Sequence, residues 1–342
     1  MSPDAVPPVL AVDGLEVEFT TRAGTVRAVR GASYAVASGR TLAVVGESGC
    51  GKSVTLQAVM GLVDSPPGRI AAGSARLLGR ELLGLPAREL DRLRGATVGM
   101  IFQDPMSALN PLMRIGEQIA EPLVAHRGMS RRAALARAVE LLERTRIPAA
   151  RERARQYPFE FSGGMLQRVM IAIALACRPA LLIADEPTTA LDVTVQDQVL
   201  GLMREIQRED GMAIVLVTHD LGVVARMADD VAVMYAGRVV EHGAVDDIFY
   251  RHAHPYSAGL LQALPGAARD RGQPLQPIPG SPPDLRTPPP GCAYAARCPR
   301  AMRICTRLEP PEFALAAGHG ARCWLHHPAA AGGATTAPGA AR

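Results

Sequence analysis

Apolar residues in the first two-thirds of the chain alternate between short continuous runs and longer segments with helical spacing. The runs at residues 41–45, 181–184 and 213–218 have the length and composition of strands that are buried on both faces. The segments at residues 54–62 and 193–209 instead place apolar side chains on one helical face. Strands that alternate with helices predict an α/β fold with a mostly parallel sheet covered on both sides.

Further strands are expected outside this alternation, at residues 9–19, 27–37, 69–78 and 97–102. A glycine-containing turn joins the first two of them, which predicts antiparallel strands at the N-terminus. The sequence from about residue 112 to 178 has helical periodicity, and Ser130 is a suitable N-cap for a helix over residues 131–145. This pattern predicts a helical insertion into the α/β core.

Composition changes towards the C-terminus and divides the chain into parts. Residues 274–290 contain eight prolines in 17 positions, which predicts an extended linker. The last 51 residues contain four of the six cysteines and end in an Ala/Gly-rich stretch. We expect an α/β domain at 8–264 with a helical subdomain at about 104–178, a Pro-rich linker at 265–291, a Cys-rich extension at 292–327 and a disordered tail at 328–342.

Charge and hydropathy exclude several classes of protein. The longest apolar stretch, residues 169–183, is interrupted by Arg178 and Pro179, so no transmembrane helix is expected. The N-terminus lacks the basic and apolar regions of a secretory signal, so the chain is expected in the cytosol. The net charge of the whole chain is +4, but residues 266–342 carry nine arginines and four acids, a net charge of +5. Residues 1–265 therefore have a net charge of −1. A nearly neutral body argues against a nucleic-acid groove, and no nucleic-acid partner is expected.

Lysine usage marks one position. The chain has 37 basic residues, and Lys52 is the only lysine among them. A compact ammonium is not interchangeable with a guanidinium where a point charge must fit among phosphates. Lys52 is therefore the first candidate functional residue.

Lys52 lies in a glycine-rich segment, residues 46–53, that fits the phosphate-loop pattern G-x-x-x-x-G-K-[ST]. A predicted buried strand precedes the segment and a predicted helix follows it, so backbone N–H groups and the helix N-terminus can surround phosphates. Lys52 is expected to reach the β- and γ-phosphates of ATP, and Ser53 to bind Mg²⁺. The predicted nucleotide-binding residues here are Gly46, Glu47, Ser48, Gly49, Cys50, Gly51, Lys52, Ser53 and Val54.

A second pair of candidates follows the apolar run at residues 181–184. Asp185 and Glu186 come directly after this predicted strand, where α/β proteins bind ligands. Asp185 is expected to hold Mg²⁺, and Glu186 to orient or deprotonate the attacking water.

The order of motifs resembles that of ATP-binding cassette proteins over residues 46–220. Phe161-Ser-Gly-Gly-Met165 resembles the family's LSGGQ signature, with Met165 in place of glutamine. Phe102-Gln103 resembles the Q-loop, Ala190-Leu191-Asp192 the D-loop, and Thr218-His219-Asp220 the switch histidine. The family also stacks an aromatic residue on adenine, but Ala23-Gly24 occupy the expected position; Phe19 is the preferred substitute, and Tyr34 the alternative.

This resemblance implies an ATPase that works as a pair of cassettes. ATP would lie between the phosphate loop of one cassette and the signature of the other, where Ser162, Gly163 and Gly164 would bind the γ-phosphate. Gln103 would contact Mg²⁺ and the attacking water, His219 would contact the γ-phosphate, and Asp192 would belong to the D-loop. Glu186, His219 and Gln103 are thus the predicted catalytic residues.

The C-terminal region is similar to that of oligopeptide and dipeptide importer ATPases, in particular the first of two paired subunits. The similarity rests on residues 254–256, 278–284 and 291–299 and on the later cysteines. It implies an ATPase at the cytoplasmic face of the membrane, bound to two transmembrane permease subunits and a second, related cassette subunit. An extracytoplasmic binding protein would deliver the substrate, whose identity (dipeptide, oligopeptide, nickel chelate or glutathione) the sequence leaves open.

The C-terminal cysteines are Cys292, Cys298, Cys305 and Cys323. Four cysteines in a cytosolic chain favour a metal site over disulfides, and four thiolates are the usual ligands of an iron–sulfur cluster. Their spacing lacks the paired C-x2-C of common zinc ribbons. The resemblance implies a [4Fe–4S] cluster, with Zn²⁺ or four unligated thiols as the alternatives.

Two other functions compete with peptide import. One is a soluble cassette protein that acts on nucleic acid or ribosomes, and the other is an RNA-binding module with a zinc knuckle. The nearly neutral charge of residues 1–265 disfavours the first function. The second is disfavoured because an RNA-binding module would not explain the complete set of ATPase motifs.

Overall fold

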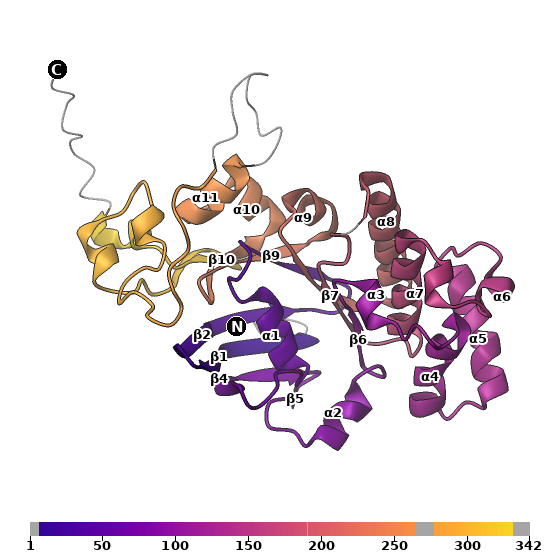
Figure 1. Cartoon of the computed structure of the whole chain (residues 1–342). Helices are drawn as coiled ribbons and strands as arrows, with labels where there is room; N and C mark the ends of the chain where they lie inside the picture. Colours follow the sequence, from indigo (N-terminus) through magenta and orange to yellow (C-terminus); the bar gives the residue numbers. More distant parts are fainter. Residues whose placement is uncertain (1–6, 190, 264–276, 331–342) are drawn as a thin grey trace.

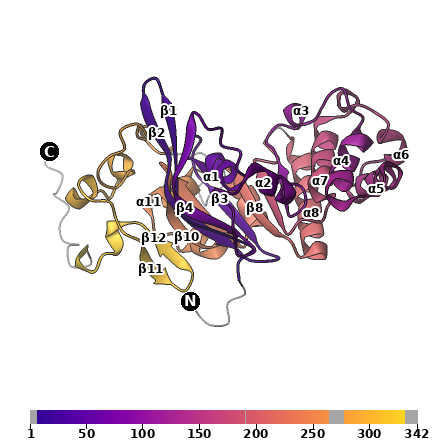
Figure 2. The ribbon, with the colours of Figure 1, turned by 90° about the horizontal axis from the view of Figure 1, so that it is seen from below.

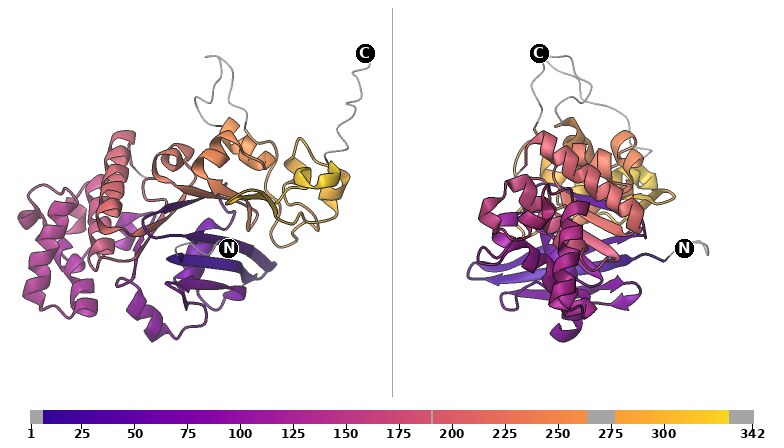
Figure 3. Two further views of the ribbon diagram at one scale, coloured as in Figure 1. Left: turned by 180° about the vertical axis from the view of Figure 1, so that it is seen from behind. Right: turned by 90° about the vertical axis from the view of Figure 1, so that its right-hand side faces the viewer.

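A computed structural model describes residues 7–189, 191–263 and 277–330 of the chain. An α/β body forms the centre, and a helical lobe and a C-terminal extension lie at its opposite ends (Figure 1; Figure 3). Among the residues in those ranges, no helix combines the length and apolar character needed to cross a bilayer. The expected tail beyond residue 330 and the linker residues 265–276 lie outside the described part of the chain.

The main sheet has eight strands in the order β11-β12-β10-β9-β3-β8-β7-β6. Strands β9, β3, β8, β7 and β6 are parallel, and the other three pair antiparallel at one edge. This confirms the predicted mostly parallel sheet. The strands are β3 (Thr41–Val45), β6 (Val98–Ile101), β7 (Leu181–Asp185), β8 (Ala213–Thr218), β9 (Asp230–Tyr235), β10 (Arg238–Ala244), β11 (Phe313–Ala316) and β12 (His319–Ala321).

The apolar runs of the parallel strands are explained by burial on both faces. In β7, Leu181 and Ile183 pack towards the N-terminal strands, whereas Leu182 and Ala184 pack towards the helical lobe. All four side chains are fully buried. Continuous apolar sequence is what a strand between two covered faces requires.

A smaller antiparallel sheet, in the order β2-β1-β4-β5, covers one face of the body (Figure 2). Its strands are β1 (Leu10–Thr21), β2 (Gly24–Val36), β4 (Gly68–Leu77) and β5 (Arg80–Glu81). Helix α1 (Lys52–Val59) packs between the two sheets, where Leu56 and Val59 are buried. The predicted antiparallel N-terminal strands are confirmed, and α1 follows the phosphate-loop segment directly.

The helical lobe lies between β6 and β7 in the sequence. Ser130 caps α5, because its side-chain oxygen accepts a hydrogen bond from the Ala133 N–H at 3.3 Å. Buried side chains of the lobe join those of α8 and one face of the sheet in a single core. The helices of the lobe are α3 (Pro105–Ala108), α4 (Ile115–Arg127), α5 (Arg131–Arg144), α6 (Ala150–Arg153) and α7 (Gly163–Leu175), whereas α2 (Ala87–Leu93) precedes β6 and α8 (Val193–Asp210) follows β7.

Three helices cover the other end of the main sheet: α9 (Leu221–Met227), α10 (Val245–Tyr250) and α11 (Pro255–Gln262). The extension that follows contains the short hairpin β11–β12, which continues the main sheet beside β10 (Figure 2). Residues 277–291 form neither helix nor strand but contact the body, for example through the Arg27 N–H and the Leu285 carbonyl at 3.0 Å. These residues therefore attach the extension closely to the α/β body.

Candidate functional site

The predicted catalytic and phosphate-binding residues follow four neighbouring parallel strands. Lys52 and Ser53 lie beyond β3, His219 beyond β8, Asp185 and Glu186 at the end of β7, and Gln103 beyond β6. Because these strands are adjacent and parallel, their carboxyl ends bring together residues that are far apart in the sequence.

A cavity of about 580 Å³ opens at this edge of the sheet. Of its eleven lining residues, nine are among those predicted from the sequence. The two that sequence reasoning missed are Ala28 and Thr189, and Thr189 lies three residues after Glu186 in the same loop. The lining residues are Ala28, Ser48, Gly49, Gly51, Lys52, Ser53, Val54, Gln103, Glu186, Thr189 and His219.

The phosphate loop needs glycine where its backbone passes other chain segments closely. A Cβ atom at Gly46 would lie 2.2 Å from the Met234 carbonyl oxygen, and one at Gly51 would lie 2.5 Å from the Ala28 carbonyl oxygen. Both glycines also have positive φ angles, 152° and 102°. Lys52 is buried, and its Nζ donates to the Gly46 carbonyl at 2.8 Å and the Glu47 carbonyl at 3.0 Å.

Ser53 and Asp185 form the candidate Mg²⁺ site. The Ser53 hydroxyl donates to the Asp185 carboxylate at 2.9 Å, so an oxygen from the start of α1 and one from the end of β7 lie together. Burial raises the pKa of the Asp185 carboxyl, and the Ser53 hydrogen bond partly opposes this. Both groups offer hard oxygen ligands, and a divalent cation would stabilise the negative charge that burial destabilises on Asp185.

Glu186 is held by three polar side chains. Its carboxylate accepts hydrogen bonds from Gln103 Nε2 at 3.1 Å and Thr189 Oγ1 at 2.9 Å, and lies 3.3 Å from His219 Nδ1. Its φ angle is 47°, in the left-handed region that non-glycine residues rarely adopt. Of the three predicted catalytic residues, Gln103 and His219 thus each contact Glu186.

The signature segment lines a different cavity, of about 450 Å³. Ser162 stands at the N-cap of α7, and its side chain makes no hydrogen bond to the helix. Asp192 caps α8 by accepting from the Val195 N–H at 2.9 Å. Gly163, Gly164 and Leu191 line the same cavity, which shares no residue with the first one. Ala190, the first residue of the predicted D-loop, lies outside the described residues.

Several predicted nucleotide-binding residues do not line the phosphate-loop cavity. Phe19 is not at its rim; its ring packs against Gly68 in the core beneath the small sheet. The alternative, Tyr34, is a buried core residue. The geometry therefore gives neither aromatic a place beside the phosphate loop. Burial raises the pKa of the Cys50 thiol, and Glu47 points its carboxylate away from the cavity towards Arg297.

The four C-terminal cysteines converge on one small cavity in the extension. All are free thiols, and burial raises the pKa of Cys292 and of Cys323 to about 11. Within the described ranges, however, no three or more His, Cys, Asp or Glu side chains are arranged so that they could hold a metal ion. The predicted cluster or Zn²⁺ therefore has support from the convergence of the thiols but not from a formed set of ligands.

Two family models match the chain: that of the ABC transporter at residues 29–189, and that of the oligopeptide/dipeptide transporter C-terminal region at residues 240–305. The dipeptide transport ATP-binding protein DppD of Bacillus subtilis is 51% identical over 317 residues, covering 93% of this chain and 94% of that protein. The oligopeptide transport ATP-binding protein OppD of Salmonella typhimurium is 53% identical over 304 residues, covering 89% and 90%.

Solved cassette structures share the fold. The ATP-binding cassette MJ0796, in a dimer bound to ADP and phosphate after hydrolysis, has a TM-score of 0.62 and 28% identity, covering 69% of this chain and 98% of that one. The protein cbiO1 of Clostridium perfringens, part of an ABC transporter complex, has a TM-score of 0.61 and 27% identity, covering 72% and 92%.

Proposed function

Because this chain belongs to the ABC transporter family and carries its oligopeptide/dipeptide transporter C-terminal region, we propose that it is the ATPase that energises import of di- or oligopeptides. The observation that carries the proposal is similarity to peptide-transport ATPases over both the cassette and the extension. Selectivity among peptides would reside in the membrane and receptor subunits, because the ATPase cavities described above are suited to nucleotide.

At the nucleotide site, each residue has a proposed role that follows from its position. Lys52 would leave the loop carbonyls and bind the β- and γ-phosphates of ATP. Ser53, Asp185 and Gln103 would hold Mg²⁺, which would neutralise part of the phosphate charge. Glu186 would accept a proton from the attacking water, and its contacts with Gln103 and His219 would orient it. His219 would also donate a hydrogen bond to the γ-phosphate.

A complete site would require two cassettes. The phosphate-loop cavity and the signature cavity share no lining residue, so each chain presents two separate half-sites. The Ser162 hydroxyl, which makes no capping hydrogen bond, and the helix N-terminus behind it suit an anion brought by another chain. We therefore place ATP between the phosphate loop of one cassette and Ser162, Gly163 and Gly164 of the other, with closure on binding and reopening after hydrolysis.

The proposed assembly contains two transmembrane permease subunits, this chain, and a second, related cassette subunit. This chain would lie at the cytoplasmic face of the membrane, with its helical lobe, about residues 104–178, against the permease. An extracytoplasmic binding protein would present the peptide on the other side. The domain division of residues 8–264, 265–291 and 292–327 belongs to the same proposal.

To test the assembly, the Glu186→Gln chain would be purified with ATP from detergent-solubilised membranes of its native host, since loss of hydrolysis should retain the closed pair. We expect mass spectrometry to identify two permease subunits and a second cassette. The same purification with the Glu186→Gln, Lys52→Ala double variant is the control, and it should recover less of the second cassette. Ribosomal or DNA-repair proteins without membrane partners would refute transport and favour the soluble alternative.

We also propose that Cys292, Cys298, Cys305 and Cys323 hold a [4Fe–4S] cluster. The support is their convergence on one cavity and the suitability of four thiolates as cluster ligands. Burial raises the pKa of the Cys292 and Cys323 thiols to about 11, and a bound metal would oppose this because it binds the thiolate.

Anaerobic purification tests this proposal directly. We expect about four iron atoms per chain, together with visible absorption that Cys292→Ser and Cys323→Ser reduce. Cys177→Ser is the matched control, because Cys177 is buried in the helical lobe core and should leave the iron content unchanged. Stoichiometric zinc without iron would select the zinc alternative, and the absence of both metals would leave four unligated thiols.

A further inference from the structure

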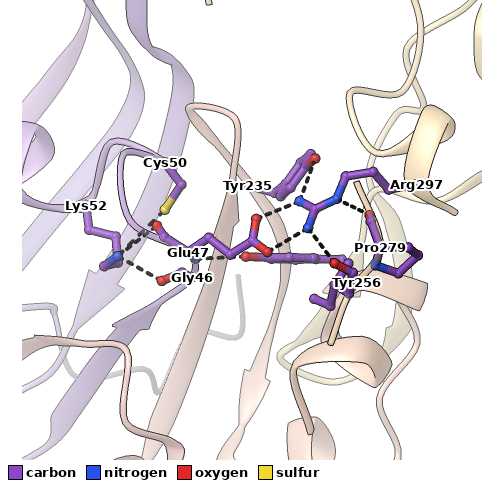
Figure 4. A network of polar contacts seen from close by, with 9 residues as sticks. Gly46, Glu47, Cys50, Lys52, Tyr235, Tyr256, Pro279 and Arg297 are labelled. Atoms are coloured by element: carbon purple, nitrogen blue, oxygen red, sulfur yellow. Dashed lines mark hydrogen bonds and ion pairs between the residues drawn. The ribbon is translucent and has the colours of Figure 1, made fainter. Parts of the chain in front are cut away.

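The outer side of the phosphate loop, away from the nucleotide cavity, is held by residues outside the ATPase motifs (Figure 4). Arg297, in a short 3₁₀ turn of the extension (Ala295–Arg297), donates two hydrogen bonds to the Glu47 carboxylate, at 2.6 and 2.8 Å. Tyr256 of α11 accepts a hydrogen bond from the Glu47 backbone N–H at 2.8 Å. Two segments that follow the cassette motifs therefore contact the same loop residue.

Glu47 uses every one of its polar groups in this arrangement. Its carbonyl accepts from Lys52, its N–H donates to Tyr256, and its carboxylate pairs with Arg297. Lys52 and Arg297 are thus bound to opposite sides of one residue (Figure 4). A movement of Glu47 would displace a group that holds Lys52.

Arg297 is itself fixed firmly. Its side chain is only 5% exposed, and its Nε donates to the Pro279 carbonyl at 2.9 Å. Nη1 also donates to the Tyr235 hydroxyl at 3.2 Å, and the guanidinium lies 5.7 Å from the Tyr235 ring centroid and 6.0 Å from that of Tyr294. A bidentate pair with this little freedom can set the position of its partner.

Attachment of the extension to the body does not depend on Arg297 alone. Strand β12 pairs with β10, His319 contacts the buried Glu241 carboxylate at 3.0 Å, and Arg30 pairs with Glu309 at 3.3 Å. None of these contacts includes a residue of the phosphate loop. The Arg297–Glu47 pair is the one that reaches the loop from the extension, among the polar contacts of the described residues.

We propose that Arg297 is a positioning residue for ATP binding, through which the C-terminal extension holds the phosphate loop in its nucleotide-binding conformation. This inference rests on the proposed assignment of residues 46–53 as the phosphate loop. A loop with glycine at positions 46, 49 and 51 has many accessible conformations, so fixing one residue lowers the cost of ordering it around phosphates. The extension thereby contributes to nucleotide affinity without contacting the nucleotide.

The first test compares ATP binding and hydrolysis by the full chain in its complex. For Arg297→Met we expect the Kd and KM for ATP to rise on the order of 10-fold with kcat changed less, because ordering the loop would then reduce the free energy of ATP binding. Arg297→Lys should be intermediate, because lysine restores the charge but not the bidentate geometry. Arg286→Met is the matched control: Arg286 forms an exposed pair with Asp284 and should leave ATP binding unchanged.

A double-mutant cycle with Glu47→Gln separates positioning from other effects. If the two residues act as a pair, the double variant should bind ATP no more weakly than the worse single variant. Unchanged ATP affinity in folded Arg297→Met, with only a lower unfolding temperature, would show a purely structural role and overturn the inference. Additive effects in the cycle would overturn it as well. Lys52→Ala serves in parallel: if its affinity is also unchanged, the phosphate-loop assignment itself fails.

Discussion

Glu186→Gln should lower the rate of ATP hydrolysis by about 10²–10⁴-fold while ATP binding is retained. The substitution keeps the shape of the side chain but removes the carboxylate that would accept a proton from water. Glu186 contacts Gln103 and His219 and is the one carboxylate among the described residues that line the cavity, so no other lining residue can replace it as the base. Steady-state phosphate release and equilibrium nucleotide binding, measured on the same preparation, check both parts.

The control for this substitution is Glu209→Gln. Glu209 lies near the end of α8, where it pairs with Arg144 on the surface, and it is not among the residues that line the cavity. Its replacement should leave hydrolysis within about twofold of the starting rate, because exposed ion pairs contribute little. Near-normal hydrolysis by Glu186→Gln would exclude Glu186 as the catalytic base.

Lys52→Ala should weaken ATP binding by about 10²-fold or more, with a corresponding loss of hydrolysis at low ATP concentration. Hydrogen bonds to charged groups contribute about 1.5–3 kcal/mol each, and Lys52 would make them with two phosphates. Lys52→Arg is the informative second variant, since the chain uses arginine at all its other basic positions. We expect it to restore little, because the planar guanidinium does not fit the buried space that the ammonium occupies.

Equilibrium titration with ATP, in the presence and absence of Mg²⁺, measures this effect. The unfolding temperature should stay close to that of the unmodified chain, because Lys52 makes its hydrogen bonds to loop carbonyls and not to core residues. ATP affinity that is unaffected in Lys52→Ala would remove the basis for the phosphate-loop assignment.

The sequence predicted the parallel sheet well because its strands are buried on both faces. Runs such as residues 41–45 and 213–218 are apolar except for a threonine at one end, Thr41 and Thr218, and the observed strands match them to the residue. The convergence of Lys52, Glu186 and His219 also followed from the sequence, since parallel neighbouring strands must end at one edge. These predictions depended on local pattern and on simple topology.

Other features depended on contacts that no local pattern records. Phe19 has the right chemistry for adenine stacking, but its strand pairs so that the ring packs near Gly68. Thr189 lines the cavity because of the conformation of the loop after β7, which includes the left-handed φ of Glu186. The pairing of Glu47 with Arg297 joins residues 250 positions apart, and nothing in either segment alone indicates the other.

The hairpin β11–β12 has a consequence for how the chain can be shortened. It covers the outer side of β10, with Glu241 opposite Ala321 and the Arg322 N–H bonded to the Val240 carbonyl at 2.8 Å. A chain ending before Phe313 would leave the backbone groups of β10 unpaired at an exposed edge, where strands of other molecules can add. Truncated cassettes should therefore self-associate, and the role of the extension is better studied by single substitutions than by its removal.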